Sequence, residues 1–183
     1  GVAAETHVID RKIAWGTKNM TKGPAMTREE AQQALETGIS MVEELKNKGY
    51  SLIATGEMGI GNTTTSSAVA SVLLNEEVEK MTGRGAGLSS EGMTRKINAI
   101  KKAIEINQPD PTDGVDVLSK VGGFDIAGMA GVFIGGAVYG VPIVIDGFIS
   151  AVAALAAARI CPLVKEYMLA SHVSKEPAAH LIL

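Results

Sequence analysis

A glycine-rich stretch, "GEMGIGNTTTSS" at residues 56–67, carries the clearest chemical signal in this sequence. Gly56, Gly61 and Thr63 have the spacing of a P-loop, in which backbone amides surround phosphates and a lysine contacts the outer ones. Asn62 stands where that lysine would be. The stretch is therefore either a degenerate nucleotide triphosphate site or an intact site for a different phosphate.

The residue types of this loop favour a single phosphate. Gly59 and Gly61 allow backbone N–H groups to converge on an anion. Amide and hydroxyl groups follow at the expected start of a helix, where the positive end of the helix dipole lies; they belong to Asn62, Thr63, Thr64 and Thr65. The alternative is a structural turn followed by threonines that cap the helix.

Carboxylates follow two apolar runs that read as strands. Glu57 comes after "SLIATG", and Asp146 comes after "VPIVI". Ligands of open α/β sheets bind outside the carboxyl ends of the strands, so both side chains are candidate ligand contacts. For Asp146 we favour another interpretation, in which it is the N-cap of the helix that follows.

A second glycine loop, "GRGAGL" at residues 83–88, matches half of a dinucleotide-binding motif. Arg84, within the loop, and Lys96, further along the chain, are candidate phosphate contacts. Lys96 flanks the apolar stripe of a predicted helix, so it is alternatively a surface lysine whose stem covers apolar side chains.

Strand and helix patterns alternate along the chain. Thr27 and Glu30 form a possible capping box for a helix that Gly49 can close. Further helical patterns cover residues 62–74, 93–104, 112–122, 122–140, 147–160 and 177–183. Strands are expected in "YSLIATG", "VPIVID" and "YMLASHV", and residues 6–15 show some strand-like alternation. This order predicts an α/β fold with a mostly parallel sheet and flanking helices.

Composition restricts the class of protein. A chain of 183 residues with 46% hydrophobic and 20% charged residues fits one folded domain, and a net charge of -3 argues against a nucleic-acid partner. The single cysteine, Cys161, excludes an internal disulfide, reads as a small buried apolar residue and fits the cytoplasm. The histidines lack metal-ligand spacing, so we expect no metal site; they are His7, His172 and His180.

An uncharged run at residues 126–145 is long enough to span a membrane. Gly140 and Pro142 interrupt it and separate a helix rich in small residues from a short β-branched run. We therefore expect a buried helix followed by a buried strand, with a membrane span as the alternative.

Several stretches resemble one family, the nicotinate-nucleotide:dimethylbenzimidazole phosphoribosyltransferases. They run through nearly the whole chain and are "GTKNMTKGPAMTREEA", "GEMGIGNTTTSSA", "GRGAGL", "GGFDIAGMAGVFIGGA", "VPIVIDGFISAVAALAA" and "ASHVSKEPA". The resemblance implies a pentosyltransferase that moves phosphoribose from nicotinate mononucleotide to 5,6-dimethylbenzimidazole, giving α-ribazole 5'-phosphate and nicotinate. It also implies a Rossmann-like domain, a homodimer, and no metal or cofactor.

The resemblance assigns roles by position. Glu57 to Gly61 would line the nucleotide and base site, while Gly85, Lys96 and Ser174 would approach the phosphate. Together with the residues singled out above, the expected substrate-binding set is Glu57, Met58, Gly59, Ile60, Gly61, Asn62, Thr63, Gly85, Lys96, Asp146 and Ser174.

The resemblance covers roughly the middle half of the family's enzyme. Residues 1–183 are accordingly expected to be a single nucleotide-binding domain from a longer transferase, with a sheet that is incomplete at both ends. The family's general base is a glutamate in a glycine-rich motif beyond residue 183, and Glu57 is a weak candidate for that role within the chain. Low turnover by this chain alone is expected, and the alternative is a nucleotide-phosphate-binding module without catalysis.

Overall fold

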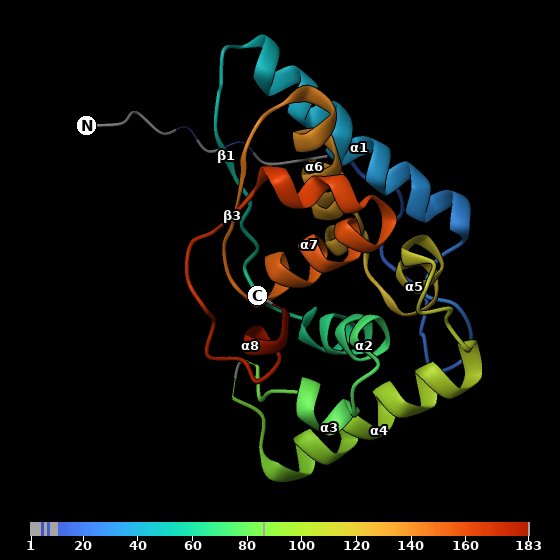
Figure 1. Ribbon diagram of the computed structural model, residues 1–183. Coiled ribbons are helices and arrows are strands. Elements are labelled where there is room, and N and C mark those ends of the chain that lie inside the picture. The colour runs from blue at the N-terminus through green and yellow to red at the C-terminus, as the bar shows by residue number, and fades with distance from the viewer. Residues whose placement is uncertain (1–4, 6, 8–10, 86, 183) are drawn as a thin grey trace.

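Parallel strands with helices packed around them form the molecule (Figure 1). The computed structural model describes residues 5, 7, 11–85 and 87–182. Its strands are β1 (Ile53–Ala54), β2 (Ile143–Ile145) and β3 (Met168–Ala170), in the sheet order β1-β2-β3. Both strand pairs are parallel, with Ile53 opposite Ile143 and Val144 opposite Leu169. The predicted α/β class and its parallel sheet are confirmed.

The first long helix, α1 (Arg28–Asn47), begins at the predicted capping box. Thr27 Oγ1 accepts the backbone N–H of Glu30 at 3.1 Å, and the Glu30 carboxylate accepts the backbone N–H of Thr27 at 2.7 Å. Two orphan amides of the first turn are thereby satisfied. The helix ends at Asn47 with Lys48 as its C-cap, and Gly49 follows with φ +94°.

The glycines of α6 (Phe124–Tyr139) serve close helix packing. In Figure 1, α6 lies against α1. A Cβ at Gly38 of α1 would lie 2.0 Å from the carbonyl oxygen of Gly128, and one at Gly131 would lie 2.0 Å from that of Leu35. The backbones approach so closely that only hydrogen fits at these positions. In the part of the chain that the structure describes, no helix is both long and apolar enough to cross a membrane.

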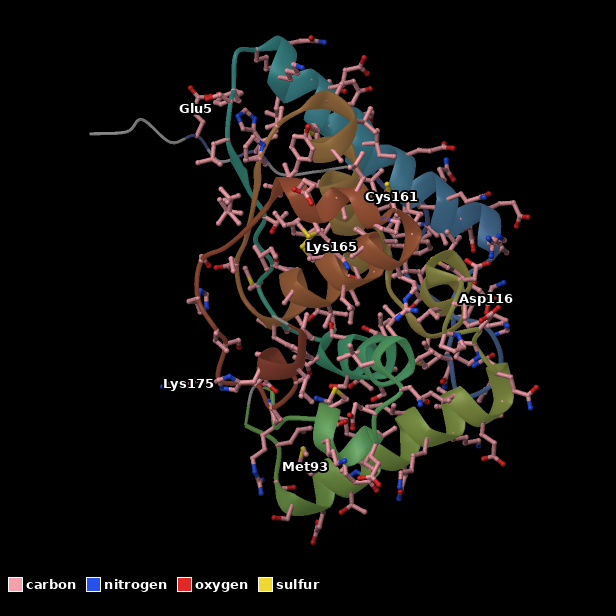
Figure 2. The ribbon with its side chains drawn as sticks, in the orientation of Figure 1. Glu5, Met93, Asp116, Cys161, Lys165 and Lys175 are labelled. Carbon is pink, nitrogen blue, oxygen red and sulfur yellow. The ribbon has the colours of Figure 1, made fainter. Side chains whose placement is uncertain are left out.

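The remaining helices pack against the sheet and against one another. They are α2 (Thr63–Leu74), α3 (Val78–Met81), α4 (Ser90–Asn107), α5 (Gly114–Val121), α7 (Phe148–Ile160), the 3-10 helix η1 (Pro162–Tyr167) and α8 (Ala179–Ile182). Helix α2 packs against both α7 and α4. Cys161 follows α7 and packs on the core (Figure 2), as its apolar interpretation predicts, but it is half-buried and not fully buried.

Short elements differ most from the expectation. Neither α3 nor η1 was anticipated, because so short a helix does not leave a periodic pattern. The strand-like alternation of residues 6–15 gives no strand over residues 11–16, and residues 6 and 8–10 lie outside the described part.

Candidate functional site

A pocket of about 330 Å³ lies at the carboxyl ends of the strands. The chain leaves β1 into residues 57–60 and leaves β2 into residues 146–150, and both segments line the pocket. Its lining residues are Glu57, Met58, Gly59, Ile60, Thr63, Gly85, Asp146, Gly147, Phe148, Ile149, Ser150 and Glu176. This is the edge at which open α/β sheets bind ligands.

The N-termini of α2 and α7 both reach this pocket. Thr63 is the first residue of α2, and Gly147 is the N-cap of α7. Neither helix start has a side-chain cap hydrogen bond, and neither has an acidic residue in its first turn. Free backbone N–H groups and the positive ends of two helix dipoles therefore favour an anion here.

The expected N-cap role of Asp146 is wrong. Gly147 occupies the N-cap position, and the backbone N–H of Asp146 donates to Ser150 Oγ at 3.1 Å. Because the helix starts one residue later than expected, Asp146 is exposed at the edge of the pocket.

Lys96 of α4 is buried, with 6% of its surface exposed. Its Nζ donates hydrogen bonds to Thr63 Oγ1 and to the carbonyl oxygen of Gly83, both at 3.0 Å. Burial lowers the pKa of Lys96, while the nearby Glu176 carboxylate acts in the opposite direction. The surface-lysine alternative is wrong, because the second glycine loop brings Gly83 against the ammonium group.

Backbone conformation in the loops explains several glycines. Gly59, Gly61 and Gly85 have φ values of +75°, +86° and +52°, which other residues rarely adopt. The Glu57 carboxylate accepts the backbone N–H of Gly59. A Cβ at Gly85 would also lie 2.9 Å from Thr63 Oγ1, so glycine permits the contact between the two loops.

Met58 and Ile60 form an open wall of the pocket. They are 84% and 73% exposed at the tip of the first glycine loop. Large apolar side chains so exposed beside a polar pocket are suited to contact a flat apolar group.

Some predicted residues lie beside the pocket and do not line it. The Asn62 side chain is buried and donates from Nδ2 to Asp125 Oδ2 at 2.6 Å. Ser174 Oγ accepts the backbone N–H of Glu176 at 3.3 Å. Arg84 is exposed and donates to the carbonyl oxygen of Leu88 at 2.6 Å. Direct contact between a ligand and any predicted site residue, whether or not it lines the pocket, stays a prediction.

Like Gly147 and Ser150, Glu176 is a lining residue that the sequence did not indicate. Glu176 stands within "HVSKEP", yet neither its residue type nor its spacing distinguishes it from the other acidic residues of the chain. Phe148 and Ile149 were read as the start of a buried helix, and their contact with the pocket follows from where α7 begins.

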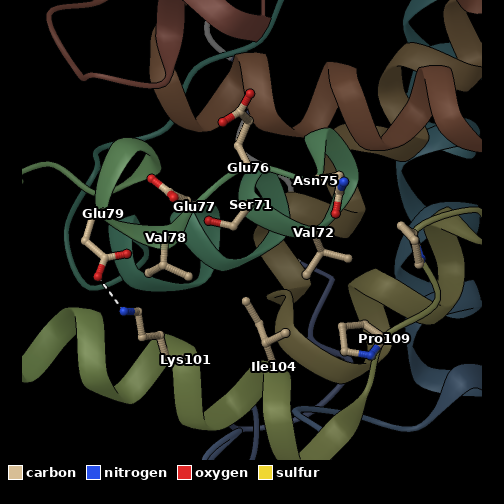
Figure 3. Close-up of a pocket in the computed structure, with 11 residues that line it drawn as sticks. Ser71, Val72, Asn75, Glu76, Glu77, Val78, Glu79, Lys101, Ile104 and Pro109 are labelled. Carbon is tan, nitrogen blue, oxygen red and sulfur yellow. Dashed lines mark hydrogen bonds and ion pairs between the residues drawn. The ribbon is translucent and has the colours of Figure 1, made fainter.

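A larger pocket, of about 720 Å³, lies at the opposite end of α2 (Figure 3). The residues after α2 line it, together with part of α4 and the prolines that follow α4. An ion pair between Glu79 and Lys101 stands at its edge. None of the predicted site residues lines this pocket.

The fold and the pocket define a class: an α/β protein with a parallel sheet and a polar pocket at the carboxyl ends of its strands. A family profile described as "Phosphoribosyltransferase" matches residues 1–183. The chain belongs to this phosphoribosyltransferase family.

Proteins named nicotinate-nucleotide--dimethylbenzimidazole phosphoribosyltransferase are similar to the chain in sequence. The one from Acetivibrio thermocellus is 60% identical over 176 residues, which cover 96% of this chain and 50% of that protein. The one from Clostridium acetobutylicum is 59% identical over 179 residues, covering 98% and 51%. The chain therefore spans about half the length of these relatives.

The fold agrees with solved structures. A crystal structure of CobT from Thermus thermophilus matches with a TM-score of 0.90 and 36% identity, over 100% of this chain and 56% of that one. A second crystal structure from Thermus thermophilus is named as a nicotinate-nucleotide-dimethylbenzimidazole phosphoribosyltransferase. It matches with a TM-score of 0.86 and 35% identity, over 100% of this chain and 55% of that one. The predicted resemblance is confirmed as membership of the family.

Proposed function

We propose that residues 1–183 form a single nucleotide-binding domain that takes part in phosphoribosyl transfer from nicotinate mononucleotide to 5,6-dimethylbenzimidazole. The products would be α-ribazole 5'-phosphate and nicotinate. The observation that carries the proposal is the convergence of two uncapped helix N-termini and Thr63, which Lys96 contacts, on one pocket at the sheet edge. The names of the two relatives described above support the choice of substrates.

The phosphate would lie at the helix N-termini. An ammonium group has three donors, and Lys96 uses two of them on Thr63 and Gly83. The third donor and the Thr63 hydroxyl are then available to phosphate oxygens. A single phosphate needs neither a P-loop lysine nor magnesium, so Asn62 at the lysine position is compatible with this assignment.

The nicotinate ring would lie toward the acidic and apolar wall of the pocket. Nicotinate mononucleotide carries a positive charge on its ring nitrogen, and the carboxylates of Glu57 and Asp146 line the pocket. Opposite charge favours the bound cation. The exposed side chains of Met58 and Ile60 would cover a flat ring.

The proposed reaction balances without a metal or a redox partner. The bond between C1' and the nicotinate nitrogen breaks, and its electron pair neutralises the ring cation. A benzimidazole nitrogen forms the new bond to C1' from the opposite face, which inverts β to α. The remaining benzimidazole N–H proton must pass to a base. We assign that step to the glutamate outside residues 1–183 that the family resemblance indicates, with Glu57 as the weaker candidate within the chain.

Assembly and location belong to the same proposal. The homodimer is what the family resemblance implies, and a cytoplasmic location fits the reducing compartment that the lone Cys161 indicates.

Calorimetric titration with nicotinate mononucleotide, without magnesium and with ATP as the comparison ligand, tests the proposal. Saturable heat with nicotinate mononucleotide and none with ATP is the expected result. Equal binding of both ligands would contradict it, as would binding of ATP alone when the titration is repeated with magnesium. Release of nicotinate after addition of 5,6-dimethylbenzimidazole separates transfer from binding.

A further inference from the structure

We infer that Glu176 is a positioning residue: its half-buried carboxylate lies against Gly83, whose carbonyl oxygen accepts from Lys96, and its negative charge keeps the Lys96 ammonium group charged and ready for the phosphate of the ligand. This inference rests on the proposed function and assigns a role to a lining residue that the sequence left unexplained.

The geometry places both side chains against Gly83. A Cβ at Gly83 would lie 1.7 Å from Glu176 Oε2 and 2.7 Å from its Cδ, so the carboxylate occupies the space that a side chain would need. The carbonyl oxygen of the same Gly83 accepts the hydrogen bond from Lys96 Nζ. Gly83 thus accepts the ammonium group through its carbonyl oxygen and, lacking a side chain, leaves room for the carboxylate, so the two charged groups lie near one residue without forming a direct ion pair.

The burial of one Glu176 carboxylate oxygen gives this arrangement an energetic effect. Glu176 Oε2 is buried and has no hydrogen-bond partner among the described residues. A buried carboxylate oxygen without a partner is unfavourable unless a nearby positive charge compensates for it. Lys175, the residue before Glu176, is exposed at the outside of the molecule (Figure 2). Of these two neighbouring charged side chains, only that of Glu176 points into the protein.

The carboxylates of α3, of α5 and of the loop before α3, all close to α4, are paired elsewhere. At α5, Asp113 pairs with Arg28 and Asp116 with Lys120. Helix α2, which packs on α4, contains no charged residue. On α3, Glu79 pairs with Lys101. On the loop before that helix, Glu76 and Glu77 pair with Lys80.

The other charged groups of the pocket and its glycine loops contact other partners or face solvent. Glu57 accepts the backbone N–H of Gly59, and Asp146 is exposed at the pocket edge. Arg84 donates to the carbonyl oxygen of Leu88. Glu176 is the carboxylate that raises the pKa of Lys96 against the lowering effect of burial.

Two opposing effects on ligand affinity follow. Removal of the Glu176 charge lets burial lower the pKa of Lys96 further, so the ammonium loses its proton at a lower pH. At a pH where Lys96 stays charged in both proteins, removal of the carboxylate takes a negative charge away from the phosphate and strengthens binding. Glu176→Gln should therefore bind more tightly than the wild type at low pH and more weakly at high pH.

The first measurement needs no ligand. NMR titration of the Lys96 side-chain resonances in the 183-residue chain reports the midpoint of its deprotonation. We expect a lower midpoint in Glu176→Gln, an intermediate one in Glu176→Asp, and no change in Glu166→Gln, which alters an exposed acid in η1. Circular dichroism of each variant verifies that it is folded, and Glu176→Asp keeps the test valid if the glutamine variant is not. An unchanged midpoint in the folded Glu176 variants overturns the inference.

The second measurement is the dissociation constant for nicotinate mononucleotide at about pH 6, far below the ordinary pKa of lysine, and at about pH 9, much nearer to it. The ratio of the Glu176→Gln and wild-type constants should cross one between these values, because the variant loses the Lys96 charge first as the pH rises. A ratio that is the same at both pH values shows a merely structural role and overturns the inference. If the Lys96 midpoint moves but the wild type binds no nicotinate mononucleotide, the electrostatic effect of Glu176 on Lys96 stands and the proposed function fails.

Discussion

The side-chain amide of Asn62 donates a 2.6 Å hydrogen bond to the carboxylate of Asp125 and thereby joins the first glycine loop to the first turn of α6. Asn62 is buried, and it occupies the position at which a P-loop has its lysine. Its amide holds the loop in place through a contact within the protein. In the proposed function, backbone amides, Thr63 and Lys96 would bind the phosphate instead.

The contact between Asn62 and Asp125 predicts a measurable coupling. Asn62→Ala should lower the free energy of unfolding by about 1–2 kcal/mol, because a hydrogen bond to a charged acceptor is lost. Asp125→Ala should do less, since that residue is exposed and water can replace its carboxylate. Urea unfolding of both single variants and the double variant should give a coupling of about 1 kcal/mol. Strictly additive effects would mean that the contact does not stabilise the fold.

Close packing of α1 on α6 predicts opposite outcomes for two glycines. Gly38→Ala should destabilise the protein by about 2–3 kcal/mol or prevent folding, because its Cβ would meet the Gly128 carbonyl oxygen at 2.0 Å. Gly128→Ala is the matched control: its Cβ meets nothing closer than 3.9 Å. Alanine in a helix is more favourable than glycine by about 0.5–1 kcal/mol, so this variant should be at least as stable as the wild type. Thermal unfolding of the two variants compares them directly, and equal stabilities would contradict the packing.

The N-cap of α5 predicts a pH-dependent stability. Asp113 Oδ1 accepts the backbone N–H groups of Val115 and Asp116 at 3.0 and 3.1 Å, and Oδ2 lies 2.7 Å from an Arg28 guanidinium nitrogen. The Arg28 contact lowers the pKa of Asp113 below its ordinary value of 3.8. The unfolded chain therefore takes up the proton first, so this contribution is present above 3.8 and is lost as the pH falls through the folded-state pKa.

Urea unfolding at several pH values checks this sign. Asp113→Asn keeps a cap acceptor but removes the charge, so its stability should approach that of the wild type as the pH falls below 3.8. Asp113→Ala should lose about 1 kcal/mol at neutral pH through loss of the cap. In an Arg28→Gln background the effect of Asp113→Asn should become much smaller; an undiminished effect would assign the pH dependence to another group.

Lys96→Met separates binding from stability. Removal of the ammonium should weaken nicotinate mononucleotide binding by at least about tenfold, the loss of one charge-assisted contact. Stability should be unchanged or higher, because an apolar side chain replaces a buried charge. Lys102→Met, which alters an exposed lysine of the same helix, is the control and should leave both quantities unchanged. Unaltered affinity in Lys96→Met would remove Lys96 from the phosphate site.

Local patterns were sufficient for most of the fold. The capping box of Thr27 and Glu30 places the start of α1, and the residues that flank α2, α6 and α7 place those helices, because caps and apolar periodicity act within a few residues. The strand order and the parallel register required the structure, since strand pairing joins residues far apart in the chain, such as Ile53 and Ile143.

The candidate site also has features that the local sequence predicts and features that only the tertiary structure shows. The sequence by itself determined the glycine loops, Thr63 at a helix start and the carboxylates Glu57 and Asp146 after their strands, because each depends on neighbouring residues. Tertiary structure alone decided that Lys96 is buried, that Asp146 is not a cap and that Glu176 lies against Gly83. Whether a charged side chain faces solvent or a pocket depends on which distant backbone packs beside it, and no local pattern encodes that contact.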